Sequence, residues 1–187
     1  MRYGPPWLVW FRTSFAMPYT PILATLAYVI HPRDGRVLLI HRNKRPDDPH
    51  WGKYNGLGGK MEPDEDPVSC IRREIQEESG LVPTRMELRG TINWPGFGKN
   101  GESWFGFLFR VNDFGGILRP DNPEGELAWH PMESIGSLPM WEGDRFFLPL
   151  VLPDKGPRFH GVMPYSEGKP VSWRYQVLES EASIAGG

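Results

Sequence analysis

The sequence has little cysteine, little net charge and no long apolar run, and each shortage excludes a class of protein. A single cysteine, Cys70, rules out an internal disulfide and fits a reducing compartment. A net charge of −2 provides no basic field for duplex nucleic acid. The longest apolar runs, 7–11 and 22–30, are too short to cross a bilayer. We therefore expect a cytoplasmic protein that binds neither a nucleic-acid polymer nor a membrane.

A chain of 187 residues is long enough for one domain with a substantial hydrophobic core. Residues 1–16 match no regular element, and Met17 stands shortly before the first predicted strand. We expect 1–16 to be a poorly ordered extension and 17–187 to be a single domain. The oligomeric state stays open between monomer and homodimer.

Apolar segments of strand length and two helical patterns follow one another along the chain. A turn signal at 32–35 joins the first two strands into a hairpin. The predicted strands are 22–30, 37–41, 86–93, 103–111 and 126–130, followed by a C-terminal hairpin of 158–163 and 171–178. The predicted helices are 67–79 and 141–150. This order predicts an α/β fold with a mixed sheet and helices on both faces.

The predicted helix at 67–79 has clear signals at both ends. The Asp66 carboxylate can cap the helix, and Pro67 suits the first helical position because its missing N–H is not needed there. Gly80 suits the residue just past the end, where a left-handed backbone is often required. These signals fix which residues share a face of the helix.

Three glutamates gather on one face of this helix. Glu74, Glu77 and Glu78 lie at positions i, i+3 and i+4, so their carboxylates are neighbours. Like charges destabilise a bare helix, and a hard divalent cation with oxygen ligands removes that cost. A solvated acidic face is the alternative. The glycine-rich loop 55–60 favours a metal or phosphate site, because glycines allow close backbone approach, although a plain bend has a similar composition.

The stretch from Gly59 to Leu81 resembles the signature box of the Nudix hydrolases, which cleave nucleoside diphosphates linked to another group. The filled box positions are Gly59, Glu65, Arg73, Glu74, Ile75, Glu77, Glu78, Gly80 and Leu81. The resemblance implies an α/β/α sandwich around a mixed sheet. It also implies bound Mg²⁺, with Mn²⁺ as an alternative, held by the Gly58 carbonyl and the three helix glutamates. Arg73 would pair with Glu65 and orient the acids.

Three further segments, before and after the helix glutamates, resemble the MutT-type 8-oxo-dGTP diphosphatases. They are 41–46, 52–60 and 140–144. The similarity implies hydrolysis of the α–β anhydride of a nucleotide substrate, giving a nucleoside monophosphate and pyrophosphate. The cations would neutralise the phosphates and acidify a water molecule. Glu74 and Glu77 are the candidates for accepting the proton of that water, and the sequence does not choose between them.

The same similarity implies a base pocket. Asn55 and Asp144 would hydrogen-bond the base edge, and Trp141 would stack on the purine. Oxidation of guanine at C8 turns N7 from an acceptor into a donor, which a carboxyl or amide oxygen can accept. A core position for Trp141 and a turn position for Asn55 are the alternatives. Gly143 stands where some relatives carry an aspartate, which disfavours recognition of oxidised adenine.

A further metal ligand and the phosphate contacts are expected elsewhere. The family often uses an acid located before a strand tryptophan, for which Glu124 matches best and Glu126 is the alternative. Lys44, Arg45 and Lys53 are candidates for triphosphate contacts, with ordinary solvated loop charge as the alternative.

Two other functions remain open. Pro95 lies near the position where ADP-ribose pyrophosphatases of the family often keep a proline, so ADP-ribose or a nucleotide sugar is the alternative substrate. A non-catalytic nucleotide-binding module is a third interpretation. The presence of all the box acids argues against that module.

Overall fold

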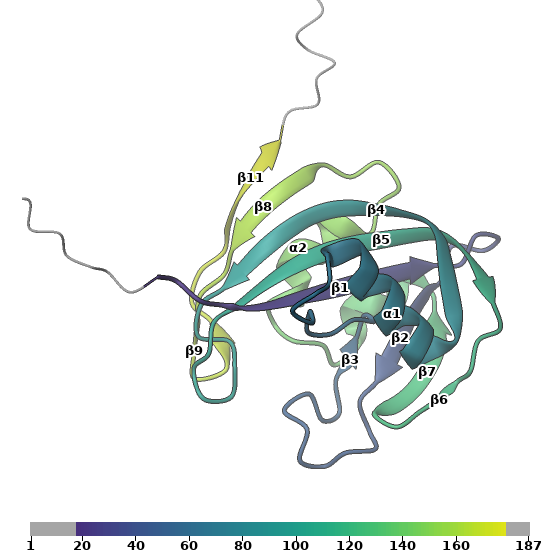
Figure 1. Ribbon diagram of the computed structural model, residues 1–187, viewed down its shortest axis with the longest axis horizontal. Helices are drawn as coiled ribbons and strands as arrows, with labels where there is room; N and C mark the ends of the chain where they lie inside the picture. Colours follow the sequence, from purple (N-terminus) through teal and green to yellow (C-terminus); the bar gives the residue numbers. More distant parts are fainter. Residues whose placement is uncertain (1–17, 179–187) are drawn as a thin grey trace, which may run out of the picture.

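The computed structural model describes residues 18–178, which form a mixed sheet of nine strands flanked by helices (Figure 1). The sheet strands are β1 Ile22–Ile30, β2 Val37–His41, β3 Tyr54–Asn55, β4 Leu81–Trp94, β5 Trp104–Gly116, β6 Asp121–Asn122, β7 Gly125–His130, β8 Arg158–Val162 and β11 Arg174–Leu178. The other elements are α1 Pro67–Ser79, the 3-10 helix η1 Met132–Ser137, α2 Asp144–Val151, and a small hairpin of β9 Tyr165–Ser166 and β10 Lys169–Pro170. The strand order is β11-β8-β4-β5-β1-β2-β7-β6, with β3 beside β2.

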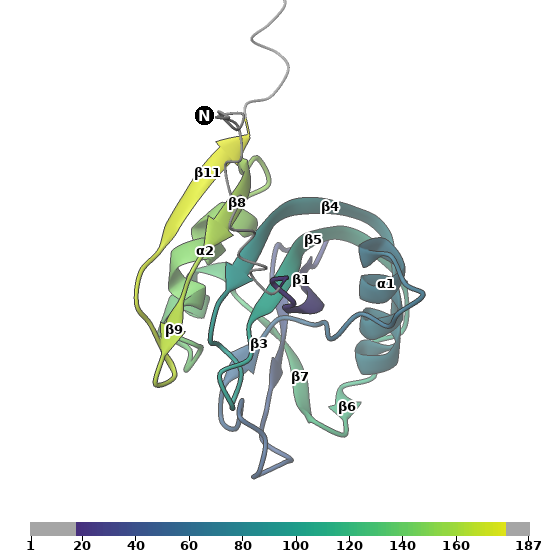
Figure 2. The same ribbon diagram turned by 60° about the vertical axis from the view of Figure 1, so that its left-hand side comes forward.

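The sheet separates two apolar layers, so the expected α/β/α sandwich around a mixed sheet is confirmed. Figure 2 shows α1 and α2 on opposite sides of the sheet. On the α1 side, Ile71 and Ile75 are buried in one cluster with Leu57. On the α2 side, Phe147 belongs to a second cluster that contains Tyr28 of β1. Successive residues of β1 therefore pack in different apolar layers, one on the α1 side and the next on the α2 side of the sheet.

Most predicted elements are present, but several boundaries differ. β5 continues to Gly116, beyond the predicted 103–111, and β11 begins at Arg174 rather than at 171. Two further differences have a visible cause. The strand predicted at 86–93 begins earlier, because β4 follows α1 directly at Leu81 and continues through register irregularities against β5. The helix predicted at 141–150 begins only at Asp144. The preceding residues form a turn, in which the Asp144 N–H bonds the Trp141 carbonyl at 3.1 Å. Both differences arise from tertiary and turn hydrogen bonds that local patterns do not specify.

The predicted extension at 1–16 lies outside the described residues. The assignment of 17–187 to one domain likewise stays a prediction. Within the described range 18–178, no helix is long and apolar enough to cross a membrane.

The caps of α1 follow the predicted pattern. The Asp66 carboxylate accepts hydrogen bonds from the N–H groups of Val68 and Ser69 at 2.7 and 3.0 Å. At the other end, Gly80 has φ +76° and donates its N–H to the Gln76 carbonyl at 2.9 Å. These caps hold α1 in a position where its acidic face lies beside the glycine-rich loop.

The glycine-rich loop runs along β1. Ala27 and Leu57 exchange backbone hydrogen bonds of 2.7 and 2.9 Å, and the Thr25 N–H bonds the Gly59 carbonyl at 2.8 Å. At Gly58, φ is +142° and a Cβ would lie 2.2 Å from the Thr25 carbonyl oxygen. Only glycine fits there, so the loop backbone can pass between β1 and α1.

Candidate active site

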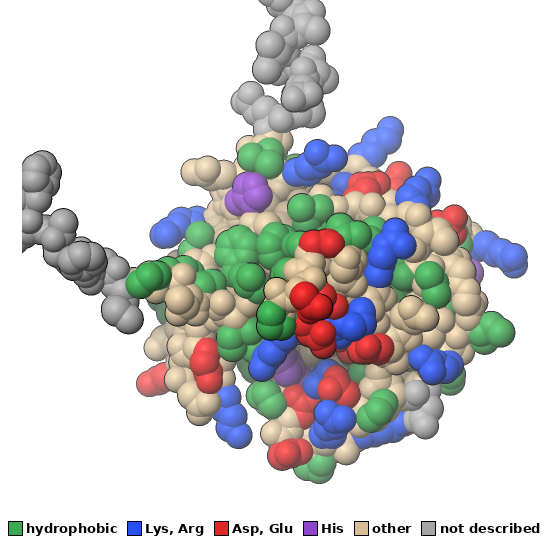
Figure 3. Space-filling model, viewed as in Figure 1, with side chains coloured by type: hydrophobic (Ala, Val, Ile, Leu, Met, Phe, Trp, Pro, Cys, Tyr) green, Lys and Arg blue, Asp and Glu red, His purple; other side chains and the backbone are tan. Residues whose placement is uncertain are grey.

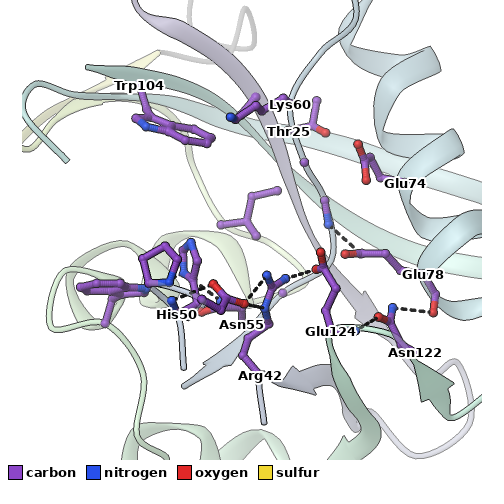
Figure 4. Close-up of a pocket in the computed structure, with 18 of the residues that line it drawn as sticks. Thr25, Arg42, His50, Asn55, Lys60, Glu74, Glu78, Trp104, Asn122 and Glu124 are labelled. Atoms are coloured by element: carbon purple, nitrogen blue, oxygen red, sulfur yellow. Dashed lines mark hydrogen bonds and ion pairs between the residues drawn. The ribbon is translucent and has the colours of Figure 1, made fainter. Parts of the chain in front are cut away.

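A cavity of about 690 Å³ lies between the glycine-rich loop, α1 and the start of α2 (Figure 4). Its volume is typical of small-molecule sites. It collects most of the residues predicted from separate parts of the sequence. Those that line it are Arg45, Asn55, Gly58, Glu74, Glu77, Glu78, Glu124, Trp141 and Asp144. Lys44 and Lys53 are not among the described residues that line it.

Arg73 and Glu65 form the expected pair. The guanidinium donates from Nε and Nη2 to the two Glu65 oxygens at 2.6 and 2.9 Å. This fork lowers the pKa of Glu65 to about 2. Arg73 Nη1 also donates to Glu74 at 2.8 Å and to Glu77 at 3.3 Å. Figure 3 shows acidic and basic side chains side by side near the middle of the face that carries α1. One arginine thus joins the loop to the acidic face of the helix.

Glu74 and Glu78 point from α1 into the cavity (Figure 4). Glu78 accepts a hydrogen bond from the Gly58 N–H at 3.0 Å. Burial raises the pKa of Glu78 to about 8, and the charges of Glu74 and Glu124 act in the same direction. Burial also raises the pKa of Glu74, against the opposing effect of Arg73. A nearby positive charge would favour the ionised form of both acids. Acids with raised pKa values in a cavity are typical of a functional site.

Glu124 faces the acids of α1 from the other wall of the cavity (Figure 4). Its carboxylate accepts hydrogen bonds from Arg42 and, at 3.0 Å, from Arg45. The alternative, Glu126, is exposed on β7, is paired in register with His41, and does not line the cavity. Position therefore favours Glu124 over Glu126 as an additional ligand.

The donor set fits a hard divalent cation. In residues 18–178, no three acidic, histidine or cysteine side chains already converge on one point as a metal cluster. Two of the acids are engaged by the protein itself, since Arg73 bonds Glu74 and the Gly58 N–H bonds Glu78. All the donors are nevertheless carboxylate or carbonyl oxygens, which such a cation prefers. A Cβ at Gly59 would lie 2.5 Å from a Glu74 oxygen, so the loop and the acids approach closely. The ligand roles stay predictions.

His50 links the two residues predicted to bind the base edge and face. Trp141 donates from Nε1 to His50 Nδ1 at 2.9 Å, and Asn55 Nδ2 lies 3.2 Å from the same atom. Because an indole N–H can only donate, Nδ1 is the acceptor and the imidazole is neutral. Burial lowers the pKa of His50, which favours that neutral form. Trp141 lies in neither core cluster, and Phe97 contacts it edge-on at 5.3 Å between ring centroids.

Asp144, the first residue of α2, lies at the same end of the cavity. Burial raises the pKa of Asp144 to about 7, although the Trp141 N–H and the charge of Lys53 act in the opposite direction. A carboxyl with that pKa can donate or accept a hydrogen bond near neutral pH. The cavity therefore has an acidic end beside α1 and an aromatic and amide end beside α2.

A family model described as NUDIX domain matches residues 20–151. The chain belongs to the Nudix family. The oxidized purine nucleoside triphosphate hydrolase of Danio rerio is 34% identical over 171 residues, covering 87% of this chain and 98% of the relative. The uncharacterized Nudix hydrolase YvcI of Bacillus subtilis is 30% identical over 137 residues, covering 71% and 81%. Among solved structures, the mutator MutT protein from Bacillus halodurans superposes with a TM-score of 0.71 at 27% identity, covering 83% of this chain and 97% of that one.

This Nudix chain is accordingly a hydrolase that acts on phosphoanhydride bonds of nucleotide substrates, with relatives of MutT type. Nudix hydrolases generally use divalent metal ions, which agrees with the oxygen donors at the acidic end of the cavity.

The cations of this Nudix site are placed differently from the lysines singled out in the sequence. Lys44 Nζ donates to the Asn122 backbone carbonyl at 3.1 Å. Lys53 Nζ lies 4.8 Å from the centroid of a Trp141 ring. Arg45, the third cation predicted from the sequence, does line the cavity, and so does Arg42, which was not predicted. Segment 41–46 indicated the right region of the chain. It did not single out Arg42, because the contact of Arg42 with Glu124, 82 positions away, leaves no local pattern in the sequence.

Proposed function

We propose that this Nudix hydrolase is a Mg²⁺-dependent nucleoside triphosphate pyrophosphohydrolase that converts 8-oxo-dGTP to 8-oxo-dGMP and pyrophosphate, and so removes oxidised nucleotides from the pool. The observation that carries the proposal is the division of one cavity into an acidic end and an aromatic end. A nucleotide has the same division, because its phosphates require a cation and its base requires a stacking surface. The similarity to the Danio rerio oxidized purine hydrolase supports the choice of base.

The acidic end would hold the cation. The residues that would hold it are the Gly58 carbonyl, Glu74, Glu77, Glu78 and Glu124. Bound there, Mg²⁺ supplies neutralisation of phosphate charge and acidification of water. Arg42 and Arg45 line the cavity and Lys44 does not, so the two arginines would contact the phosphate oxygens, since a guanidinium fork matches a phosphate as well as a carboxylate.

Glu74 is the better of the two candidates for accepting the proton of the attacking water. Burial raises its pKa, which brings a carboxylate closer to the value that suits a general base near neutral pH. Glu77 is 61% exposed, and its contact with Arg73 is the longer one. Arg73 would keep Glu74 oriented while the proton moves.

The aromatic end would bind the base. The Trp141 ring offers a face for the purine, and Lys53 packs against this tryptophan. Asp144 would accept the N7–H that guanine gains on oxidation at C8, and Asn55 would add a polar contact. Unoxidised guanine presents an N7 acceptor at that place and leaves the ionised form of Asp144, which is the form above a pH of about 7, without a donor.

The test is a steady-state comparison of 8-oxo-dGTP, dGTP and ADP-ribose with Mg²⁺, with the products identified. The proposal predicts a clearly higher kcat/KM for 8-oxo-dGTP than for dGTP, with release of pyrophosphate. Equal or faster cleavage of dGTP or ADP-ribose would refute the assigned base preference while leaving a hydrolase. Tight binding of nucleotides without any turnover would indicate a binding module instead.

A further inference from the structure

His50 holds the side-chain amide of Asn55 in one orientation. The Trp141 indole donates from Nε1 to His50 Nδ1 at 2.9 Å, and Asn55 Nδ2 lies 3.2 Å from the same nitrogen. Because an indole N–H can only donate, Nδ1 carries a lone pair and the other ring nitrogen, Nε2, carries the proton. The part of the Asn55 amide that faces this lone pair is the NH₂ group, since an amide oxygen in that place would be repelled.

The imidazole of His50 is itself fixed by its surroundings. The His50 backbone N–H donates to the Asp48 carboxylate at 2.9 Å, and the His50 carbonyl accepts the Lys53 N–H at 2.9 Å. The ring stands edge-on to Trp141, with 5.5 Å between the ring centroids. Figure 4 shows His50 and Asn55 side by side at the wall of the cavity. A ring held at its backbone and at its nitrogen keeps the neighbouring amide from flipping.

This orientation leaves the carbonyl oxygen of the Asn55 side chain, Oδ1, free for a ligand. Among residues 18–178, no donor reaches this oxygen, and it is not one of their fully buried unpaired polar atoms. Asn55 lines the cavity together with Trp141 and Asp144. Oδ1 is therefore an accessible hydrogen-bond acceptor at the end of the cavity that also holds the Asp144 carboxyl group.

We propose that His50 is a positioning residue that sets the base preference of the site, because it makes Asn55 an acceptor for an N–H group on the six-membered ring of a guanine-type base. The inference rests on the proposed function and names the second edge of the base that the cavity distinguishes. With Asp144 accepting N7–H, two acceptors match a base that has N–H groups on both edges. 8-Oxoguanine is such a base, since its N1–H and 2-amino group lie opposite N7–H.

8-Oxoadenine matches only one of the two acceptors. It has the same N7–H, but its amino group is next to N7, and N1 on the opposite edge is unprotonated. That edge would place a lone pair against Asn55 Oδ1. A site built to hydrogen-bond a polar edge discriminates strongly against an analogue that lacks the partner group. Since both nucleotides carry the same oxidised edge, a comparison between them isolates the contact with Asn55.

The experiment compares kcat/KM for 8-oxo-dGTP and 8-oxo-dATP in wild type, His50→Phe and His50→Asn. It is run at pH 8, above the pKa of about 7 to which burial raises Asp144, so that this carboxyl group is an acceptor. Phenylalanine keeps a ring and removes the acceptor, whereas asparagine loses the ring and keeps an acceptor oxygen near the position of Nδ1. We expect the preference of wild type for 8-oxo-dGTP to fall by about 3- to 10-fold in His50→Phe, the effect of one neutral hydrogen bond, and to stay closer to wild type in His50→Asn.

His130→Phe is the matched control. His130 also packs edge-on against an aromatic ring, 5.2 Å from Tyr54 between centroids, but it does not line the cavity. This variant should keep the preference of wild type. A second measurement needs no variant to fold: long-range proton–nitrogen correlation spectra of the ligand-free wild type should show His50 neutral, with its proton on Nε2.

Four results would overturn the inference. They are a wild type without preference for 8-oxo-dGTP over 8-oxo-dATP, an unchanged preference in His50→Phe, an equal loss in His50→Phe and His50→Asn, and a proton on Nδ1 of His50. The proposed function fails on a different comparison, namely when 8-oxo-dGTP is not favoured over dGTP.

Discussion

Glu78→Gln should stabilise the metal-free protein while it abolishes most of the activity. Glutamine keeps an oxygen that can accept the Gly58 N–H, which bonds Glu78 at 3.0 Å in the wild type. It removes a carboxylate whose pKa burial raises to about 8 from the usual 4.5. A raised carboxyl pKa means that the folded state holds the proton more tightly than the unfolded state. Stability is therefore lost as the pH rises from about 4.5 to about 8.

The size of this effect follows from the pKa. At about 1.4 kcal/mol per pKa unit, the rise to about 8 sets an upper bound of about 5 kcal/mol on the destabilisation at alkaline pH. Relaxation and water penetration reduce such penalties, so we expect about 1–3 kcal/mol. For a chain of this size, that corresponds to a rise of about 3–10 °C in the melting temperature of the variant.

The assay is thermal unfolding of wild type and Glu78→Gln in EDTA at pH 4.5 and pH 8.5, repeated at pH 8.5 with excess Mg²⁺. The variant should melt near wild type at pH 4.5 and above it at pH 8.5, because the wild type loses stability between the unfolded-state and folded-state pKa values of Glu78. Mg²⁺ should stabilise wild type more than the variant, since a ligand that binds only the folded state shifts its stability. Glu77→Gln is the control for stability, because Glu77 is 61% exposed and its charge is solvated. The same difference in melting temperature at both pH values, or equal stabilisation of both proteins by Mg²⁺, would refute the reasoning.

Three further predictions test the surroundings of the site. Asp66→Ala removes the cap of α1 and should cost about 1 kcal/mol of unfolding free energy, measured by urea denaturation, with kcat unchanged. His50→Ala leaves the Trp141 indole N–H without its acceptor and should raise the KM for the nucleotide by about tenfold with a smaller change in kcat; an unchanged KM would show that this bond does not position the pocket. Arg73→Lys cannot make the fork to Glu65, so kcat should fall by at least about tenfold while the melting temperature changes little; a near wild-type kcat would remove the orienting role.

The acidic end of the site was predictable because its geometry is local. The α1 glutamates are placed by helical periodicity between the Asp66 cap and Gly80, and the structure keeps both caps. The Arg73–Glu65 pair spans only eight positions and closes over the same loop. The geometry of interactions within a single loop and helix depends little on the contacts made by the rest of the fold.

The base end could be predicted only in part. Trp141 and Asn55 came from resemblance to a family, and their shared partner His50 has no signal in the sequence, since it acts through a contact 91 positions away. Such features depend on how distant segments meet, which periodicity does not encode.

The most direct test of the account is a crystal structure of the protein with Mn²⁺ and 8-oxo-dGMP, with the metal located by its anomalous scattering. The account predicts Mn²⁺ between the Gly58 carbonyl and the carboxylates of Glu74 and Glu78, with the base against Trp141 and its oxidised edge toward Asp144. A metal bound to other residues, or a base bound outside this cavity, would contradict it.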